Sequence, residues 1–248
     1  MGTRFLLLAS LVCLLFCASC STTNKIAYLQ HAQDTSYKKA LTIVDAPFQK
    51  NDILTITISS ANAQASADFN KGELGAAKGY LINNDGNVEL PMLGDVKAAG
   101  LTKKQLRESI TNTILKKKLL VDPLVEIRYI NFEITVLGEV GKPSVINIPS
   151  EQVTLLKALS LAGDLTIYGK RDNILLIREE DGVRKTRHID LTSADFLNSD
   201  YYYLKPNDLL YVEPNKTKIA VSGRSQQTIP LIFSSLTMLF FVFDKVIK

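Results

Sequence analysis

The sequence is poor in the residues that build redox, metal and haem sites. It has three cysteines, Cys13, Cys17 and Cys20, two histidines, His31 and His188, and no tryptophan. All three cysteines lie within the first twenty residues, so the sequence predicts no disulfide in the folded part of the chain. Two histidines without a cysteine pair form no recognisable zinc or haem motif. We therefore expect no metal and no cofactor, and both histidines are interpreted as surface residues.

Charge and catalytic motifs exclude further classes of protein. Twenty-nine basic residues face 25 acidic ones, a net charge of +4 that is too balanced to favour a nucleic acid partner. The acidic run 179–181 adjoins a predicted hairpin tip and is interpreted as solvated. Serine and histidine never occur with the glycines of a nucleophile elbow. We expect that the protein is not an enzyme.

The N-terminus has the order of a secretory signal. Arg4 supplies a positive charge, residues 5–18 are apolar apart from Ser10, and Ala18-Ser19-Cys20 ends the run with small residues. The apolar run would rise only ~21 Å as a helix, which is short for a membrane span. Small residues before Cys20 resemble a lipobox, which predicts a signal peptide over 1–19 and a lipid, including palmitate, on Cys20. An ordinary signal peptide and an uncleaved anchor stay open as alternatives.

The C-terminal region is also apolar. Residues 229–243 contain no charged side chain, and a helix of this length rises ~22 Å. That falls short of a ~30 Å inner-membrane core but suits a thinner bilayer such as the bacterial outer membrane. We predict a connector and transmembrane helix over 217–248. Its spanning segment would include Ile229, Leu231, Phe233, Leu236, Leu239, Phe240 and Phe243. A buried C-terminal core helix is the alternative.

Between these ends, the sequence predicts a first module over residues 47–131, preceded by a polar, flexible tether over 20–46. Alternation over 53–58 predicts a half-buried strand, and 59–78 is predicted to be a long surface excursion. Asn84-Asp85-Gly86-Asn87 predicts a hairpin between strands at 80–82 and 88–90. Thr102 and Gln105 predict a capping box for a helix that ends in Lys116-Lys117-Lys118. A strand begins near Val125.

A second module is predicted over residues 132–216. Strands are expected at 134–137 and 145–148, and a helix capped by Thr154 is expected to end near Gly163. Asp181-Gly182 predicts a hairpin between 174–177 and 183–189. The turn before 209–212 repeats the Asn-Asp pair that precedes 53–56. Residues 219–223 are interpreted separately, as a possible remnant strand of another module. Segregated strands and helices indicate two small mixed modules of the α+β class with a C-terminal membrane-associated helix.

These motifs resemble the polysaccharide export domain. The resemblance rests on the turn and strand at 51–56, on the DG-x-hydrophobic-x-LP-x-x-G pattern from Asp85 to Gly94, on Gly100-Leu101-Thr102, and on Asp122-Pro123-Leu124-Val125. Residues 138–143 and 154–163 resemble the soluble-ligand-binding β-grasp (SLBB) module that follows it. This chain has Gly163-Asp164 where that family often has two glycines, and it holds one complete β-grasp module. Together the motifs resemble Wza-type outer-membrane export lipoproteins.

The resemblance implies a function and partners. It implies an outer-membrane, lipid-anchored subunit with periplasmic domains, in a homo-oligomeric ring that passes capsular or exopolysaccharide to the cell surface. The C-terminal helices would form a barrel across the outer membrane, in contact with its lipid. The expected partner is an inner-membrane chain-length regulator or tyrosine autokinase. The alternative is a monomeric periplasmic lipoprotein that binds a soluble glycan or other ligand through its β-grasp module.

The run Tyr201-Tyr202-Tyr203 is the candidate glycan contact. Tyrosine rings present apolar faces together with hydroxyl groups, so they could stack on sugar rings. The alternative is that the three tyrosines belong to a strand edge that leads into the core strand at 204–212.

Overall fold

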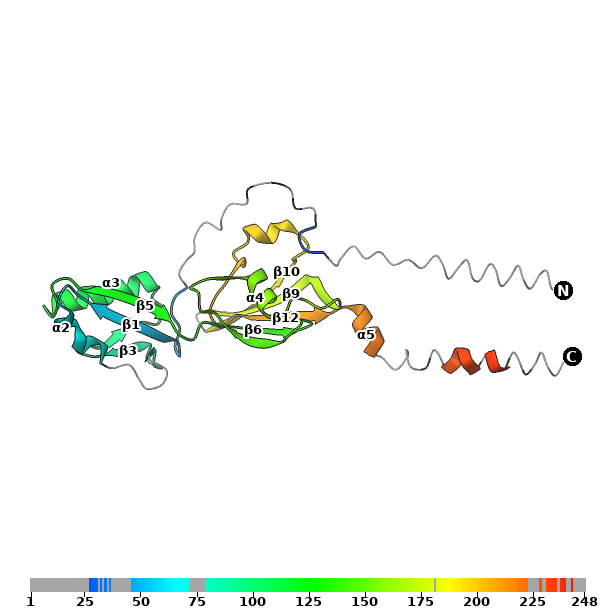
Figure 1. The fold of residues 1–248 in the computed structure, drawn as a ribbon, viewed down its shortest axis with the longest axis horizontal. Helices are drawn as coiled ribbons and strands as arrows, with labels where there is room; N and C mark the ends of the chain where they lie inside the picture. The colour runs from blue at the N-terminus through cyan, green and yellow to red at the C-terminus, as the bar shows by residue number, and fades with distance from the viewer. Residues whose placement is uncertain are drawn as a thin grey trace.

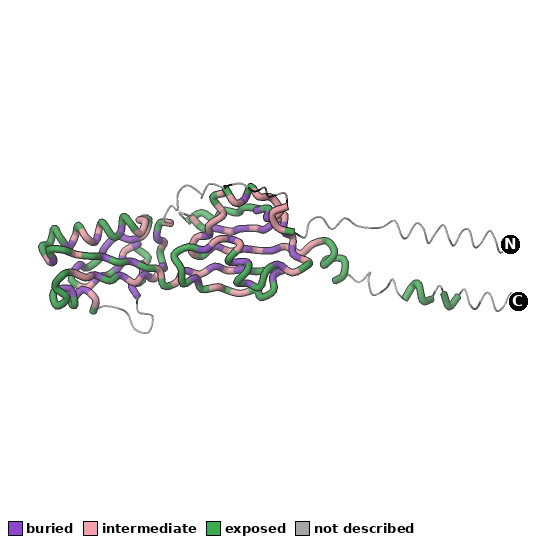
Figure 2. The backbone as a smooth tube through the Cα atoms, turned by 45° about the horizontal axis from the view of Figure 1, so that its top comes forward, coloured by how far each residue is buried: buried purple, intermediate pink, exposed green. Residues whose placement is uncertain are grey.

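Two separate hydrophobic cores divide the described part of the chain into two modules that lie end to end (Figure 1). The computed structural model describes residues 27–30, 32, 34, 36, 46–71, 79–180, 182–222, 228, 231–235, 237–239 and 242. The first core is built from residues between Phe48 and Ile127, and the second from residues between Phe132 and Val212. Buried residues follow the strands of both modules (Figure 2). The combination of strands and segregated helices agrees with the α+β class.

The first module is a three-stranded antiparallel sheet with one long helix packed against it. The sheet has the order β2 (Tyr80–Leu81), β1 (Ile53–Ser59), β5 (Leu124–Tyr129), and the helix is α3 (Lys103–Lys116). Leu54, Ile56 and Ile58 are buried on one face of β1, as their alternation predicts. On α3 the residues at i, i+4 and i+8, Leu106, Ile110 and Ile114, are fully buried. Full burial of each stabilises the module by roughly 1.5–3 kcal/mol.

The predicted start of α3 is confirmed. Thr102 is the N-cap, and its hydroxyl accepts a hydrogen bond from the Gln105 amide at 3.3 Å. The Gln105 side chain in turn accepts one from the Thr102 amide at 2.9 Å. The end of the helix differs from the prediction. Only Lys116 lies in the last turn, because the helix stops there and Lys117 donates from Nζ to the Leu93 carbonyl at 3.0 Å.

The predicted hairpin between residues 80–82 and 88–90 is wrong in its pairing, although its turn forms. The Asn83 amide donates to the Asn87 carbonyl at 2.9 Å, and Gly86 adopts φ +83°. Beyond the turn the strands separate. β2 pairs with β1, whereas β3 (Asn87–Leu90) pairs with β4 (Gly94–Lys97). The edge of β1 is a longer-range partner that a local turn signal does not reveal.

The predicted excursion at 59–78 is partly ordered. Its described residues form α2 (Ala63–Ser66), capped by Asn62, and the 3-10 helix η1 (Ala67–Asn70). Phe69 lies in the first core, and Asn70 bonds both the amide and the carbonyl of Ile58. One buried aromatic side chain and the hydrogen bonds of Asn70 therefore fix a segment whose composition resembles a loop.

The second module is built on a five-stranded sheet of order β10-β9-β12-β6-β7. These strands are β10 (Val183–Ile189), β9 (Gly169–Glu180), β12 (Leu209–Pro214), β6 (Glu133–Gly138) and β7 (Ser144–Asn147). The β12–β6 pair is parallel, and the other three pairs of this sheet are antiparallel. The helix α4 (Leu155–Leu161) packs its buried Leu155, Ala158 and Leu159 into the core. The remaining elements are β8 (Val153–Thr154), β11 (Tyr203–Leu204), which pairs with β8, and η3 (Ala194–Asn198).

Most of the predicted elements of this module are confirmed. The Thr154 hydroxyl caps α4 by accepting a bond from the Lys157 amide, and Gly163 has a φ of +79° just beyond the helix. The β9–β10 hairpin forms with Val183 opposite Glu180. β9 starts earlier than predicted, since Gly169–Asn173 continue the strand and the Pro214–Gly169 pair extends the ladder to β12.

The same turn precedes β1 and β12. Asn51 and Asn207 have positive φ values of 71° and 65°, which asparagine tolerates better than most residues. The following aspartate accepts a hydrogen bond from the amide three residues earlier, at 2.7 Å from Gln49 to Asp52 and at 2.7 Å from Lys205 to Asp208. The local similarity read from the sequence is therefore a shared turn, and both carboxylates are buried.

Residues 27–30, inside the predicted tether, lie against the second module. The Leu29 amide donates to the Leu191 carbonyl at 3.0 Å, and the Tyr28 hydroxyl donates to Asp164. The Tyr28 ring lies 5.3 Å from the guanidinium of the buried Arg171. Burial and the Asp164 carboxylate raise the pKa of Tyr28 above its ordinary value. Part of the predicted tether is thus bound to a folded module.

Beyond β12 the chain forms a helix, α5 (Lys216–Ser222), so the idea of a remnant strand at 219–223 is wrong for residues 219–222. Lys218 Nζ lies 3.2 Å from the carboxylate of Glu139, the residue after β6, and 5.1 Å from the centre of the Tyr168 ring. Residues 231–235 and 237–239 are helical. Among the described residues, no helix has the length and apolarity needed to cross a membrane.

Candidate functional site

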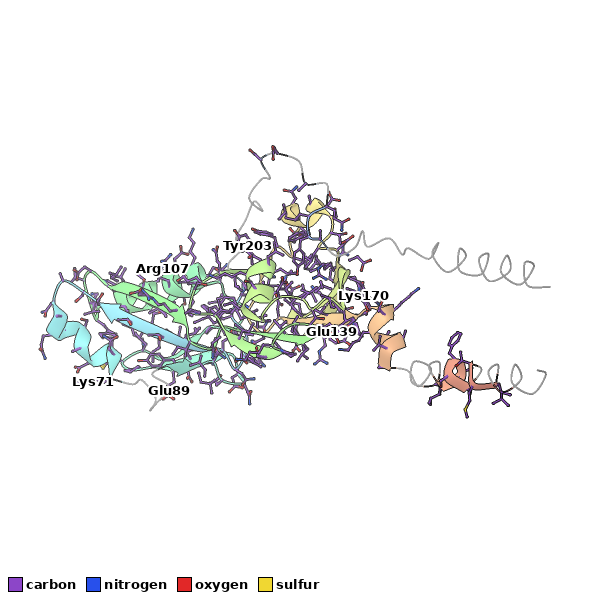
Figure 3. The ribbon with its side chains drawn as sticks, turned by 45° about the vertical axis from the view of Figure 1, so that its right-hand side comes forward. Lys71, Glu89, Arg107, Glu139, Lys170 and Tyr203 are labelled. Carbon is purple, nitrogen blue, oxygen red and sulfur yellow. The ribbon has the colours of Figure 1, made fainter. Side chains whose placement is uncertain are left out.

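The candidate site is a cleft between the two modules with a volume of about 690 Å³. Phe48, Lys103 and Tyr129 of the first module line one side. The other side comes from the second module, where β9, β10 and the segment 200–206 contribute. Figure 3 shows Tyr203 on the side of the second module that faces the first.

Contacts across the junction hold the walls of this cleft together. Lys103 at the start of α3 forms an ion pair with Glu151, and Gln49 donates from Nε2 to the Glu179 carbonyl at 2.9 Å. The ring centres of Phe48 and Tyr129 are 4.9 Å apart, and those of Tyr129 and Phe132 are 6.3 Å apart. Tyr129 packs against both cores, so an aromatic series continues from one module into the other.

Strand register concentrates cations on one face of the β9–β10 hairpin. Leu176, Arg178 and Glu180 alternate along β9 and therefore share a face. Opposite them on β10 lie Arg187, paired with Leu176, and Lys185, paired with Arg178. Both β10 side chains are exposed and line the cleft.

Arg178 is fixed from below by a buried ion pair. Its Nε lies 2.8 Å from Asp208 Oδ1 and its Nη2 lies 2.7 Å from Asp208 Oδ2, a bidentate contact with a carboxylate that has no exposed surface. Burial lowers the pKa of Arg178, but the hydrogen bonds and charge of Asp208 outweigh burial and leave that pKa above its ordinary value. Arg178 is therefore a permanent cation in the floor of the cleft.

Glu180 connects two lysines at the rim. Its carboxylate lies 2.7 Å from Lys185 Nζ and 2.6 Å from Lys205 Nζ. Hydrogen bonds from Lys185 and Lys205 lower the pKa of Glu180 to about 2. Glu180 is half-buried between these two lysines, which contradicts the prediction that this acidic residue is solvated at a hairpin tip.

The three tyrosines of the candidate glycan contact have different surroundings, although the ring centres of Tyr202 and Tyr203 are only 5.0 Å apart. Tyr201 and Tyr203 line the cleft, whereas Tyr202 packs against Phe196 at 6.1 Å and its backbone carbonyl accepts a bond from the Leu155 amide. Tyr203 belongs to β11, in agreement with the strand-edge alternative for that residue. Whether any of them contacts a glycan stays a prediction.

The cations around Tyr201 were missed in the sequence. The guanidinium carbons of Arg178 and Arg187 each lie 5.6 Å from the centre of its ring. The sequence offered one signal for Arg178, which is a charged residue directly after the apolar run 174–177. It offered none for Arg187, because the pairing of β9 with β10 must be known before the two arginines can be placed on the same face.

The predicted membrane attachments are only partly covered by the structure. Cys20 lies outside the described residues, as do Ile229, Leu236, Phe240 and Phe243. Leu231, Phe233 and Leu239 are described and exposed. The described residues contain no group of three metal-binding side chains, and the expectation of no metal and no cofactor stays a prediction.

Comparison with known families and proteins follows the two-module division. Residues 45–129 match the family described as "Polysaccharide biosynthesis/export protein", and residues 133–212 match the SLBB domain. Two curated relatives carry the name EPS I polysaccharide export outer membrane protein EpsA. The one from Ralstonia solanacearum is 28% identical over 149 residues, which cover 58% of this chain and 39% of the relative. The one from Ralstonia nicotianae is 28% identical over 174 residues, or 68% of this chain and 44% of the relative.

The chain therefore spans less than half the length of the relatives that it matches. The matches nevertheless take up both described modules, in the order that the sequence motifs predict. Residues 45–129 therefore form a domain of the polysaccharide biosynthesis/export family, and one matched SLBB domain follows it at 133–212.

Proposed function

We propose that this protein is a subunit of an outer-membrane apparatus that exports a polysaccharide from the periplasm to the cell surface. The observation that carries the proposal is the consecutive match of an export domain and an SLBB domain over residues 45–212. Both relatives are named as EPS I polysaccharide export outer membrane proteins. The role is that of a transport component, and the protein catalyses no reaction.

The proposal includes two membrane attachments. The signal peptide over 1–19 would leave a lipid on Cys20, and the apolar residues 229–243 would enter the same bilayer. A helix satisfies its backbone hydrogen bonds internally, so a ring of such tails could line a pore where an open sheet could not. The tether would cover 20–46, the export domain 47–131, the SLBB domain 132–216, and the connector and tail 217–248.

The arrangement of the second module supports attachment at one end. Segment 164–171 holds Tyr28 through Asp164 and Arg171, and it also holds the start of α5, because the Asn215 amide donates to the Tyr168 carbonyl at 2.7 Å. The N-terminal segment and the C-terminal helix therefore leave the module from neighbouring positions (Figure 1). A lipid and a tail that enter one bilayer require this proximity.

The assembly that we propose is a homo-oligomeric ring in the outer membrane. Its domains would face the periplasm, and an inner-membrane chain-length regulator or tyrosine autokinase would be its partner. The cargo would be a capsular polysaccharide or an exopolysaccharide. The two modules lie end to end (Figure 1). Each elongated subunit would therefore form one segment of the wall around a central cavity.

Deletion and complementation test the proposal. A strain without this chain should lose surface polysaccharide, and the full chain should restore it. A chain without residues 228–248 should fail to restore it while both modules keep their circular dichroism and unfolding transition. Electron microscopy of detergent-extracted protein should show rings. A monodisperse monomer whose truncated form still supports export would refute the proposal.

Lipidation is tested separately. Cys20→Ala should abolish palmitate labelling, whereas Cys13→Ala, in the same segment, should leave it intact. Equal labelling of the two variants would exclude Cys20 as the attachment site.

A further inference from the structure

The cleft between the modules contains a cation that no described carboxylate neutralises. Arg187 is exposed on β10, lines the cleft, and has no ion pair among the described residues. Its position is set by the Tyr201 ring, 5.6 Å from its guanidinium carbon. A guanidinium packed on an aromatic ring keeps its donors free and ordered, ready for a bidentate contact with an anion.

The other cations of the cleft are fixed by partners. Arg178 is held by Asp208, while Lys185 and Lys205 share Glu180. The lining includes six basic side chains and three acidic ones. Asp208 and Glu126, which pair with Arg178 and Arg128 from outside the lining, reduce the excess to one positive charge. This single excess charge belongs to the cleft as a whole: Lys185 and Lys205 share Glu180, while Arg187 and Asp200 form no ion pair among the described residues.

Flat apolar surfaces accompany this charge. Tyr129, Tyr201 and Tyr203 all line the cleft, next to apolar side chains such as Phe132. Tyrosine rings provide apolar faces together with hydroxyl groups, a combination that suits a sugar ring with its apolar face and polar edge. The volume of about 690 Å³ lies within the range of small-ligand sites.

We propose that this cleft binds an anionic sugar residue of the transported chain, with Arg187 contacting its carboxylate and the tyrosines packing against its ring. The inference rests on the proposed function, which supplies a polysaccharide as ligand, and it specifies the substrate as acidic. Glu180 acts as a positioning residue that holds Lys185 and Lys205 beside the site. The strands fix these residues, so the site forms before the ligand arrives.

The test is binding by the full chain in mild detergent, measured by isothermal titration calorimetry. The probes are a hexamer of galacturonic acid and maltohexaose, a neutral oligosaccharide with the same number of sugars. We expect the acidic hexamer to bind, the neutral one to bind at least about tenfold more weakly, and added salt to weaken the difference. Equal binding of both probes, or no binding of either, would overturn the proposal.

Matched variants locate the site. Arg187→Ala should weaken binding of the acidic hexamer about tenfold or more, since it removes a charged hydrogen-bond donor. Arg184→Ala, on the same strand but outside the cleft lining, should leave binding unchanged. Glu180→Gln removes the ionic contacts that hold Lys185 and Lys205 beside the site and should weaken binding several-fold. An equal loss for Arg187→Ala and Arg184→Ala would mean that binding follows the general charge of β10.

The outcomes separate this inference from the proposed function. If the chain is required for export but the acidic hexamer does not bind, the function stands and the cleft site is refuted. If Arg187→Ala instead changes the size of the oligomer without any hexamer binding, the cleft is a contact between subunits and the site is likewise refuted. If the hexamer binds through Arg187 in a chain that export does not require, the cleft site stands and the proposed exporter role fails.

Discussion

Asp52 and Asp208 occupy the same position of the same turn but have different partners. Asp208 forms a bidentate ion pair with Arg178, whereas Asp52 forms no ion pair among the described residues and receives the Gln49 amide. Both side chains are almost completely buried. The turn therefore needs the acceptor oxygen at both positions, but the negative charge has a buried partner only at Asp208.

This difference predicts unequal costs for the same substitution. Asp208→Asn leaves Arg178 as an unpaired buried cation and should lower the free energy of unfolding by about 3–5 kcal/mol. Asp52→Asn keeps an oxygen for the Gln49 amide and should change it by less than about 1 kcal/mol. Urea denaturation of the two variants measures both values. Adding Arg178→Met to Asp208→Asn should recover part of the loss, and equal losses for the two single variants would contradict the argument.

Asp52 also predicts a dependence of stability on pH. Burial raises the pKa of Asp52, while hydrogen bonds from the Gln49 amide and from Tyr129 oppose the rise. The folded state therefore binds the Asp52 proton more tightly than the unfolded state does. The stability contributed by protonated Asp52 is lost as the pH rises from ~3.9 through the pKa of the folded state. Relative to Asp52→Asn, the natural protein should lose free energy of unfolding over this window. A difference that stays constant from pH 4 to 7 would exclude this assignment.

Glu180 should show the opposite dependence. Its pKa of about 2 in the folded protein lies below the ordinary value of ~4.3. The stability that ionised Glu180 contributes is therefore complete above pH ~4.3 and is lost as the pH falls toward 2. The difference in unfolding free energy between the natural protein and Glu180→Gln should therefore shrink below pH 4. Guanidinium titrations at pH 3 and pH 6 measure it, and an unchanged difference would count against the two lysine contacts.

At the scale of elements, the end of β6 requires a glycine for two independent reasons. Gly138 has a φ of +92°, and a Cβ at this position would lie 2.1 Å from the carbonyl oxygen of Val212 on the neighbouring β12. Gly182, in the β9–β10 turn, has a φ of +73° but no heavy atom within 4 Å of such a Cβ. A side chain at Gly182 would therefore meet backbone strain alone, whereas a side chain at Gly138 would meet both backbone strain and a steric clash with β12.

Alanine at these two positions should therefore have different effects. Gly182→Ala meets only the strain of a positive φ, roughly 1–2 kcal/mol. Gly138→Ala must also displace β12, and it should lose at least about 1 kcal/mol more. Thermal unfolding of both variants provides the comparison. If Gly138→Ala were as stable as Gly182→Ala, the parallel β6–β12 pairing would be in error.

The elements also show what a sequence can predict and where it fails. The capping box of α3 and the Leu106, Ile110 and Ile114 stripe were predictable, because both depend on residues a few positions apart. The pairing of β3 with β4 was not, since turn chemistry fixes the bend but not the partner of the strand beyond it. The cleft was missed for the same reason: Arg178 and Arg187 meet at Tyr201 only through the hairpin register.

At the scale of the whole molecule, the docked residues 27–30 join the N-terminal segment to the second module. Tyr28 contributes a hydroxyl to Asp164 and a ring to Arg171, and the Leu29 amide reaches Leu191. Composition indicated a tether throughout 20–46, and nothing periodic marks these four residues. Their partners lie more than 130 positions away in the chain, which places the contact beyond local sequence reasoning.

Variants of Tyr28 should release this contact in two steps. Tyr28→Phe removes the hydroxyl but keeps the ring over Arg171, so it should moderately increase hydrogen exchange at the Leu29 amide. Tyr28→Ala removes both and should raise that exchange to the rate of a free peptide. Tyr37→Ala, a tyrosine substitution further along the same polar segment, serves as the control and should leave the Leu29 amide protected. Unchanged protection in Tyr28→Ala would show that Tyr28 does not hold the segment.

Docking at Tyr28 determines which part of the molecule would bear tension. Seven backbone steps separate Cys20 from Ala27, so a lipid on Cys20 could stand at most ~25 Å from the docked segment. A pull on that lipid would pass through Tyr28 and Leu29 into the β-sheet of the second module, and segment 31–46 would carry none of it. The export domain would then move with the SLBB domain as its distal extension, free of direct strain from the membrane.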